Sequence, residues 1–230
     1  SSDVCSSDLC TIAQIRAYKP QSSSLGCGQV LPCPYTADKA RIVVQEMIDG
    51  ISLELVEKRL VTDQLVLTVG YDIENLTRPE IRKVYKGPVT TDRYGRRVPK
   101  HAHGTWNLPR ATSSSSELLE AMAALYDKIV NPALLIRRMS LSACHVVNEK
   151  MAKEREQKET FEQLDLFTDY AKKEAKEKEE QKKRERERRM QEALLTIKKK
   201  YGKNAVLRGM NFEEGATAKE RNGQIGGHQA

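Results

Sequence analysis

The stretch QLVLTVGYD, residues 64–72, alternates apolar and polar side chains with the two-residue period of a β-strand. Successive side chains of a strand point to opposite faces of the sheet, so one face of this strand is expected to be buried. The other face would lie in water, and the sheet would need helices on one side only. The apolar set is Leu65, Leu67, Val69 and Tyr71.

Two amphipathic helices are predicted on either side of this strand. Residues 37–60 carry apolar side chains at helical spacing and follow Thr36, a residue type that is favoured as an N-cap. A second helix is predicted within SSSSELLEAMAALYDKIV, residues 113–130, where Ser114 and Glu117 have the spacing of a capping box. Each helix has one apolar stripe, which it can bury against the sheet.

Three further segments are predicted to be strands. Residues 24–36 would form an irregular edge strand, because they contain two glycines and two prolines, and residues 101–112 and 134–147 alternate. The intervening residues 73–100 are basic and rich in Pro and Gly, which favours a loop or an extended hairpin. In the last strand the predicted inward set is Met139, Leu141, Ala143 and His145.

The resulting order is β-α-β-β-α-β, the split βαβ pattern. It predicts an α+β fold in which a four-stranded antiparallel sheet carries two helices on one face. The opposite face would hold Arg, His and hydroxyl side chains, which suit contacts with a phosphate backbone, although an ordinary solvated face is the alternative. Aromatic residues are nearly absent from it, which disfavours base stacking of single-stranded RNA. The polar set is His103, Thr105, Asn107, Arg138 and Ser140.

Composition narrows the class of protein. The chain has 230 residues, of which 31% are charged, with a formal net charge of +7 and a pI near 9.1. A basic balance favours nucleic acid or an acidic surface as partner. No apolar run approaches the ~20 residues of a membrane helix, and no signal peptide is visible. The five cysteines are an odd number at irregular spacing, so we expect a reduced, cytoplasmic protein.

Metal binding by the His and Cys residues is not expected. His101 and His103 share one face of a predicted strand, but Cys27 and Cys33 lie in the irregular edge segment and no CxxC occurs. The chain also lacks a phosphate-binding loop, a dinucleotide fingerprint and a nucleophile elbow. Core or surface positions are the better interpretation for these side chains.

Four segments together resemble a known family. YKPQSSSLGCGQVLPCPYTADKA, LVTDQLVLTVGYD, HGTWNLPRATSSS and IRRMSLSA are similar to the thumb end and little-finger domain of Y-family, lesion-bypass DNA polymerases. More narrowly, they resemble the UmuC/DinB-like repair proteins of Gram-positive bacteria. The resemblance covers about residues 10–170 and implies a thumb end at 10–20 and a little-finger domain at 21–148, which would grip primer–template duplex across its major groove.

The resemblance also implies DNA contacts. The short strand start would bring backbone amides close to a phosphate, and a pair of arginines opens the last strand. Strand alternation allows only one of that pair to face the DNA, and Arg138 is favoured because it shares the polar face. The implied DNA-binding set is Ser24, Gly26, Gln29, His103, Thr105, Arg137 and Arg138.

Catalysis in this family uses Mg²⁺ held by palm carboxylates, which should precede residue 10. Asp63, Asp72 and Glu74 show no pairing that suits a two-metal site, so we interpret them as surface or turn acids. We therefore expect this chain to bind DNA but not to polymerise alone. A stand-alone nucleic-acid-binding or regulatory module is the alternative, and a palm domain encoded upstream in the gene would decide between them.

Residues 149–200 are predicted to be helical, with mixed charges at i,i+4 spacing. Within them, Gln163-Leu164-Asp165-Leu166-Phe167 resembles the pentapeptide by which bacterial polymerases dock on the β sliding clamp. A glutamine amide can both donate and accept hydrogen bonds, and the apolar side chains can fill a groove. The alternative is an amphipathic turn that packs back on the domain through Phe161, Leu164 and Phe167.

The two ends complete the expected organisation. DVCSSDL within residues 1–9 resembles a translated sequencing-adapter oligonucleotide, and we interpret residues 1–9 as a sequencing artefact. Residues 201–230 end in a Gly-rich run, which favours a flexible tail. We expect the chain to be a monomer.

Overall fold

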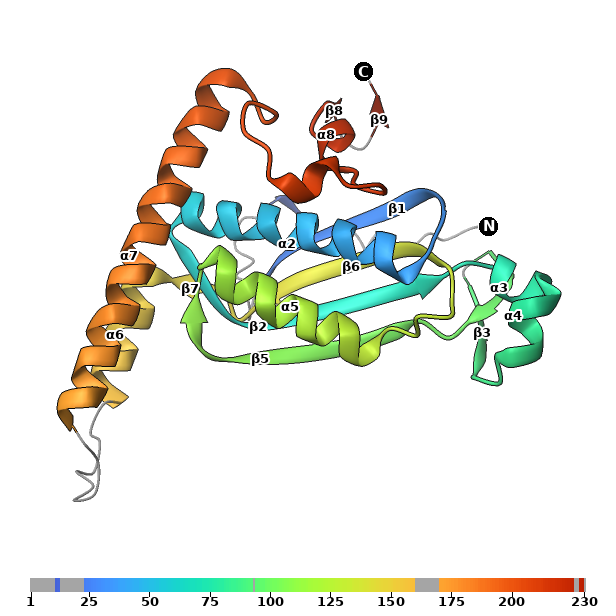
Figure 1. Cartoon of the computed structure of the whole chain (residues 1–230), viewed down its shortest axis with the longest axis horizontal. Helices are drawn as coiled ribbons and strands as arrows, with labels where there is room; N and C mark the ends of the chain where they lie inside the picture. Colours follow the sequence, from blue (N-terminus) through green and yellow to red (C-terminus); the bar gives the residue numbers. More distant parts are fainter. Residues whose placement is uncertain (1–10, 13–22, 93, 160–169, 226–227, 230) are drawn as a thin grey trace.

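The central sheet has four long strands that pair antiparallel in the order β1-β6-β2-β5. The computed structural model describes residues 11–12, 23–92, 94–159, 170–225 and 228–229. Its fold is α+β. As predicted, two helices, α2 and α5, cover one face of the sheet (Figure 1). The strands are β1 (Leu25–Tyr35), β2 (Leu60–Tyr71), β5 (Ala102–Thr112) and β6 (Ile136–Cys144), and short β7 (Val147–Asn148) also pairs with β2.

The two covering helices are α2 (Ala37–Lys58) and α5 (Ser115–Ile129). The predicted start of α5 is confirmed, because the Ser114 side chain accepts a hydrogen bond from the backbone N–H of Glu117. Helix α2 ends where Arg59 adopts the left-handed conformation with φ 55°. The start of α5 and the end of α2 each lie within two residues of the position predicted from the sequence.

The hydrophobic core lies between these helices and the sheet. The alternating residues of β2 are fully buried beneath them, and each buried leucine contributes about 1.5–3 kcal/mol relative to an exposed one. The apolar side chains of the strands and those of the two helices thus form a single core layer. Its largest members are Leu31, Met47, Ile48, Leu55, Leu65, Leu67, Leu118, Met122, Leu125, Leu134, Ile136 and Leu141.

Strand β6 ends one residue before His145, and the prediction that His145 points inward is wrong. Its side chain is exposed, its φ is 52°, and its Nδ1 lies 2.9 Å from Asp63 Oδ1. The left-handed backbone interrupts the alternation, so that Val146 is buried instead.

The basic excursion is more structured than a loop. It contains two short helices, α3 (Glu74–Thr77) and α4 (Pro79–Val84), before the hairpin β3 (Val89–Thr91) and β4 (Arg97–Pro99). The hairpin was anticipated, whereas the helices are too short to show a periodic apolar stripe. Pro79 occupies the first turn of α4, where its missing N–H leaves no helical hydrogen bond unmade.

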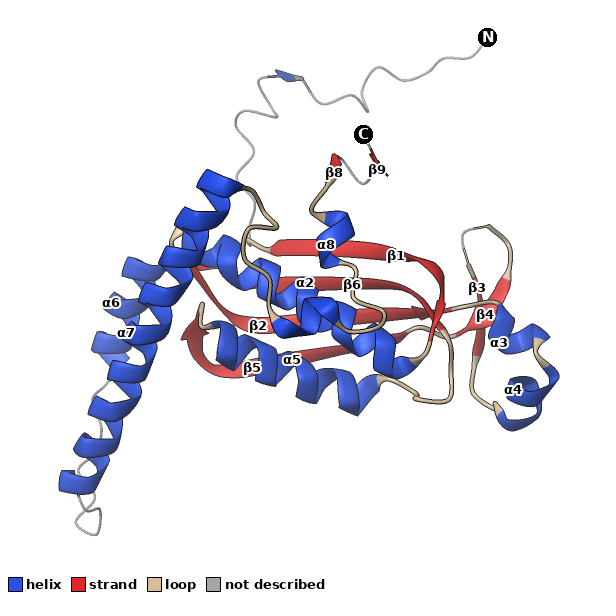
Figure 2. Ribbon diagram, turned by 45° about the horizontal axis from the view of Figure 1, so that its top comes forward, coloured by secondary structure: helices blue, strands red, loops and turns tan. Residues whose placement is uncertain are grey.

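Two helices follow the sheet, α6 (Glu149–Glu159) and α7 (Tyr170–Tyr201), and they lie side by side at one end of it (Figures 1 and 2). Helix α7 is held against the start of α5: the buried Gln191 amide donates to Ser113 O at 3.0 Å and to Ser115 Oγ at 2.8 Å. No described helix is both long enough and apolar enough to cross a bilayer.

The segment after α7 differs from the expected flexible tail. Its described residues include η2 (Gly209–Phe212), α8 (Ala218–Arg221), β8 (Gln224–Ile225) and β9 (His228–Gln229), with η2 and α8 packed on α2. Glu46, a buried residue of α2, accepts hydrogen bonds from this segment. A glycine-rich sequence predicts flexibility locally, but the partner that orders this segment lies far away in the sequence.

Candidate nucleic-acid interface

The sheet face opposite the helices is a regular array of small and polar side chains. Strand register aligns Gly28, Ser140, Thr68 and His103 across all four strands in one row. The adjacent rows align in the same way. They consist of Gly26, Ser142, Val66 and Thr105 on one side and of Val30, Arg138 and Gly70 on the other.

Arg138 is the cation of this face, and its aliphatic stem lies across Gly70 of the neighbouring strand. A Cβ placed on Gly70 would come within 2.6 Å of Arg138 Cγ and 2.7 Å of Arg138 Nε. Arg138 is exposed, and among the described residues none forms a hydrogen bond or ion pair with its guanidinium. A shallow cavity beside it, of about 240 Å³, is lined by Thr68, Gly70, His101, Arg138, Met139 and Ser140.

Hydrogen bonds organise the polar side chains across β2 and β5. Gln64 Nε2 donates to Asn107 Oδ1 at 2.9 Å, and Thr68 Oγ1 lies 2.9 Å from His103 Nδ1. These bonds pair neighbouring strands and leave hydroxyl and imidazole groups at the surface. None of the described outward-facing residues of the four strands in these rows carries a carboxylate, so nothing in them repels a phosphate.

Arg137 lies off this array, although it is adjacent to Arg138. The register shifts between Gly70 and Tyr71, and β6 bulges at Arg137. Its Nη1 donates to Pro32 O at 3.1 Å, and its Nε lies 3.8 Å from Asp72 Oδ2. The guanidinium therefore holds the irregular part of β1, which agrees with the prediction that only Arg138 of the pair shares the polar face.

The three candidates at the start of β1 do not lie together. Ser24 and Gly26 are exposed, and a Cβ on Gly26 would come within 2.9 Å of Ser142 Oγ. Gln29 lies on the helix side of the strand, where its Nε2 donates to Thr217 Oγ1 and its Oε1 accepts from Arg221. An odd separation along a strand places Gly26 and Gln29 on opposite faces, so parity alone could have separated them.

No group of three or more His, Cys, Asp or Glu residues within the described part of the chain could hold a metal ion. Cys27 is on β1 and His103 on β5, the two edges of the sheet, and they face opposite sides. The three acids near β2 have local roles: Asp63 pairs with His145, Asp72 Oδ1 accepts from Glu74 N, and Glu74 pairs with Arg78.

The pentapeptide 163–167 lies outside the described residues. Helix α6 ends at Glu159 before it, and helix α7 begins at Tyr170 after it.

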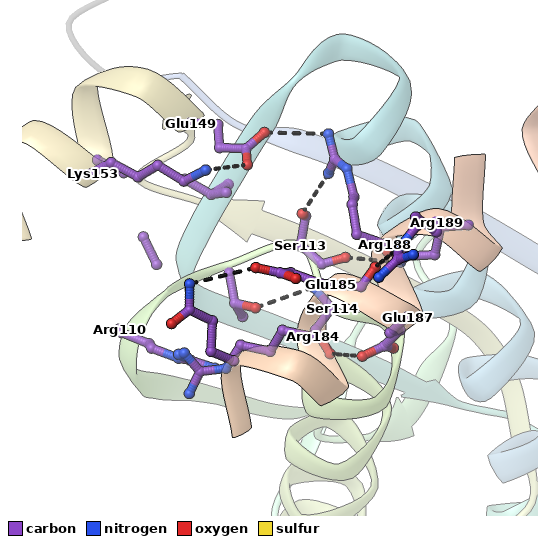
Figure 3. Close-up of a pocket in the computed structure, with 16 residues that line it drawn as sticks. Arg110, Ser113, Ser114, Glu149, Lys153, Arg184, Glu185, Glu187, Arg188 and Arg189 are labelled. Carbon is purple, nitrogen blue, oxygen red and sulfur yellow. Dashed lines mark hydrogen bonds and ion pairs between the residues drawn. The ribbon is translucent and has the colours of Figure 1, made fainter. Parts of the chain in front are cut away.

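A second cavity, which the sequence did not reveal, lies where α6 and α7 meet the turn between β5 and α5 (Figure 3). Glu187 of α7 accepts hydrogen bonds from Ser114 Oγ and Ser116 N, and Arg188 pairs with Glu149 at 3.2 Å. The volume of this cavity is about 640 Å³. Five cationic and three anionic side chains line it, and the contacts of Glu187 and Arg188 join the helical arm to the domain. In the sequence, only the run of serines 113–116 could have indicated that a contact forms here.

Comparison with protein-family models and with curated proteins finds no match to this chain. Among solved structures, one described as the complex of beta-clamp processivity factor and the little finger domain of PolIV is similar to it. The alignment has 9% sequence identity and a TM-score of 0.35, and it covers 64% of this chain and 100% of that chain. The likeness is distant, and it assigns no activity to this chain.

Proposed function

We propose that this chain is the DNA-binding C-terminal portion of a Y-family translesion DNA polymerase, which grips primer–template duplex and docks on the β sliding clamp. The observation that carries the proposal is the sheet face: among its described residues, the aligned rows hold small and polar side chains, the unpaired Arg138 and no carboxylate. The βαββαβ topology and the family resemblance of the sequence are consistent with it.

The chemistry of this face suits a phosphate backbone. Hydroxyl and imidazole groups donate to phosphate oxygens, and the Arg138 guanidinium adds a full positive charge. Gly26, Gly28 and Gly70 have no side chains that project from the sheet, so a phosphate backbone can approach the strands closely. Contacts of this kind position a duplex without reading its sequence, as a polymerase that moves along DNA requires.

Docking on the sliding clamp is the second part of the proposal, and it is supported by residues 163–167 as a sequence motif. Short apolar peptides bind weakly by themselves, but tethering to a partner already on the same DNA raises the effective concentration. The pentapeptide would thus hold the DNA-gripping domain near a primer terminus.

Duplex binding is tested by fluorescence anisotropy of a labelled primer–template duplex at several salt concentrations. Arg138→Ala should weaken binding and reduce the slope of log K against log salt by about one, because one phosphate contact is lost. Arg137→Ala is the matched control, since that guanidinium is engaged by Pro32 and Asp72. An unchanged slope for Arg138→Ala, or equal slopes for both variants, would place Arg138 off the interface.

Clamp docking is tested by pull-down of the full chain with purified clamp. The double variant Leu166→Ala and Phe167→Ala should not be captured, but it should still bind duplex. Equal capture of variant and parent chain would contradict clamp docking without affecting the proposal for DNA.

A further inference from the structure

The positive charge of the chain is concentrated in one protruding segment at an end of the sheet, residues 78–100, here named the basic lobe. It has eight basic residues against Glu80 and Asp92, a formal net charge of +6, whereas the whole chain carries +7. The basic residues are Arg78, Arg82, Lys83, Lys86, Arg93, Arg96, Arg97 and Lys100. Such a concentration of one charge on a small projection attracts polyanions.

The basic lobe projects from one end of the sheet (Figure 2). Helix α3, which immediately precedes the lobe, is anchored to the sheet: the buried Asn75 side chain donates to Leu135 O at 2.8 Å and accepts from Leu135 N at 2.7 Å. Ile81 and Tyr85 pack against the hydrophobic core. Residue Leu135 immediately precedes β6, so the lobe is fixed near the end of the sheet that carries Arg138.

Near the tip of the lobe, hydrogen bonds to Asp92 hold the backbone on either side of an exposed aromatic ring. Asp92 Oδ1 accepts from the backbone N–H of Tyr94 and of Arg96, and Gly95 supplies the positive φ of 77° that the turn needs. Tyr94 is 69% exposed, and the Arg96 guanidinium lies 5.1 Å from its ring centroid. An exposed ring beside cations can stack on a nucleic-acid base while the cations contact the phosphates.

Five cations of the basic lobe remain available for a partner. Arg82, Lys83, Lys86, Arg97 and Lys100 are exposed, and none of them forms a side-chain ion pair with any other described residue. The open sheet face continues this surface through exposed His101, which lines the cavity next to Arg138. A polyanion that lies on the sheet face would therefore meet the lobe as well.

We propose that the basic lobe is a second nucleic-acid contact, separate from the sheet face, with its cations on the phosphate backbone and Tyr94 stacked on an unpaired base. This inference rests on the proposed function, because it takes DNA as the occupant of the adjoining face. Nucleic acid fits better than an acidic peptide, since an exposed ring amid cations is the arrangement that binds bases beside phosphates. Unpaired bases occur where a template strand extends beyond its primer.

The stacking contact is tested with two labelled duplexes, one blunt and one with a single-stranded 5′ template overhang. Tyr94→Ala should weaken binding of the overhang duplex roughly fivefold or more, equally at all salt concentrations, and should leave the blunt duplex unchanged. Tyr201→Ala is the matched control, because Tyr201 is 67% exposed and Lys200 lies 5.1 Å from its ring centroid. Equal effects of the two variants would overturn the stacking contact.

The phosphate contacts are tested by the salt slope. Arg97→Ala combined with Lys100→Ala should reduce the slope by about two, whereas Lys182→Ala combined with Lys183→Ala, the same charge removed from α7, should not. Identical slopes for both double variants would overturn the lobe as a specific contact. Competition by polyglutamate as effective as that by single-stranded DNA, per charge, would also overturn nucleic acid as the occupant.

Arg138→Ala, measured in parallel, separates this inference from the proposed function. If Arg138→Ala changes the slope and the lobe variants do not, only the lobe is excluded. If the lobe variants alone respond, the lobe contact stands and the sheet face is excluded. If no variant responds, both are excluded.

Discussion

The carboxylate of Glu46 accepts the backbone N–H of Thr217 at 2.8 Å, across a separation of 171 residues in the sequence. The same carboxylate accepts from Ala218 N at 3.0 Å and from Asn211 Nδ2 at 2.7 Å. Glu46 is only 3% exposed, so these donors replace the water that a carboxylate would otherwise bind. This side chain of α2 therefore helps to order the segment after α7, together with Asp49, which pairs with Arg208.

Replacement of Glu46 by Ala should lower the free energy of unfolding by about 2–4 kcal/mol. Buried N–H groups of residues 217 and 218 would lose their acceptor, and hydrogen bonds to charged groups are worth about 1.5–3 kcal/mol. Urea denaturation measures the change. Glu54→Ala is the control on the same helix, because its pair with Lys58 is exposed and contributes less than ~1 kcal/mol. Equal losses would mean that the contact is not stabilising.

Alanine at two strand glycines should change different properties of the protein, stability at Gly104 and duplex binding at Gly70. A Cβ on Gly104 would come within 2.7 Å of Ile129 Cγ2 in the core, so Gly104→Ala should destabilise the fold by about 1–3 kcal/mol. A Cβ on Gly70 would meet only the flexible Arg138 side chain, so Gly70→Ala should displace that guanidinium. We expect weaker duplex binding with near-normal stability, measured by anisotropy and urea denaturation. A stable Gly104→Ala protein would contradict the packing.

Release of α7 is predicted for Gln191→Ala. The Gln191 amide is buried and bridges Ser113 O and Ser115 Oγ, so its loss leaves a buried carbonyl without its donor and costs about 1–3 kcal/mol. Hydrogen exchange of the α7 amides should accelerate while the sheet amides stay protected. Gln181→Ala, an exposed change on the same helix, should leave both sets unchanged. Unaltered exchange in Gln191→Ala would show that other contacts hold the helix.

The cysteines of β1 should differ in reactivity. Burial raises the pKa of the Cys27 thiol to about 11, so little thiolate forms at neutral pH, whereas Cys33 is exposed. Iodoacetamide at pH 8 should modify Cys33 well before Cys27 in the folded protein, and both equally in urea. Peptide mass mapping distinguishes the sites. Faster labelling of Cys27 in the folded protein would contradict its placement beneath the helices.

Low pH should loosen the tip of the basic lobe. Hydrogen bonds from Arg96 N, and then from its side chain and from Tyr94 N, hold the pKa of Asp92 below its ordinary 3.8. The stabilisation is therefore present above that value and is lost as the pH falls through the lowered pKa. The amide resonances of Tyr94 and Arg96 should broaden or shift below about pH 4. Asp92→Asn should keep these resonances insensitive to pH in that range.

The sequence by itself determined the layered architecture. The period of two in residues 64–72 assigns buried and exposed faces from backbone geometry alone, and the capping pair Ser114 and Glu117 places the start of α5. The polar face around His103 and Arg138 was predictable for the same reason. These signals are local, because each depends only on residues within a few positions of one another.

The tertiary structure alone decided which partners hold Arg137 and where the last segment packs. A bulge in β6 ties Arg137 to Pro32, and buried Glu46 captures the chain near Thr217, where local composition predicts flexibility. Helix α7, a solvated helix by composition, is likewise held by the buried side chain of Gln191 together with the contacts of Glu187 and Arg188. Such contacts join residues far apart in the sequence, and no local pattern encodes them because their partners meet only after the sheet and helices have packed.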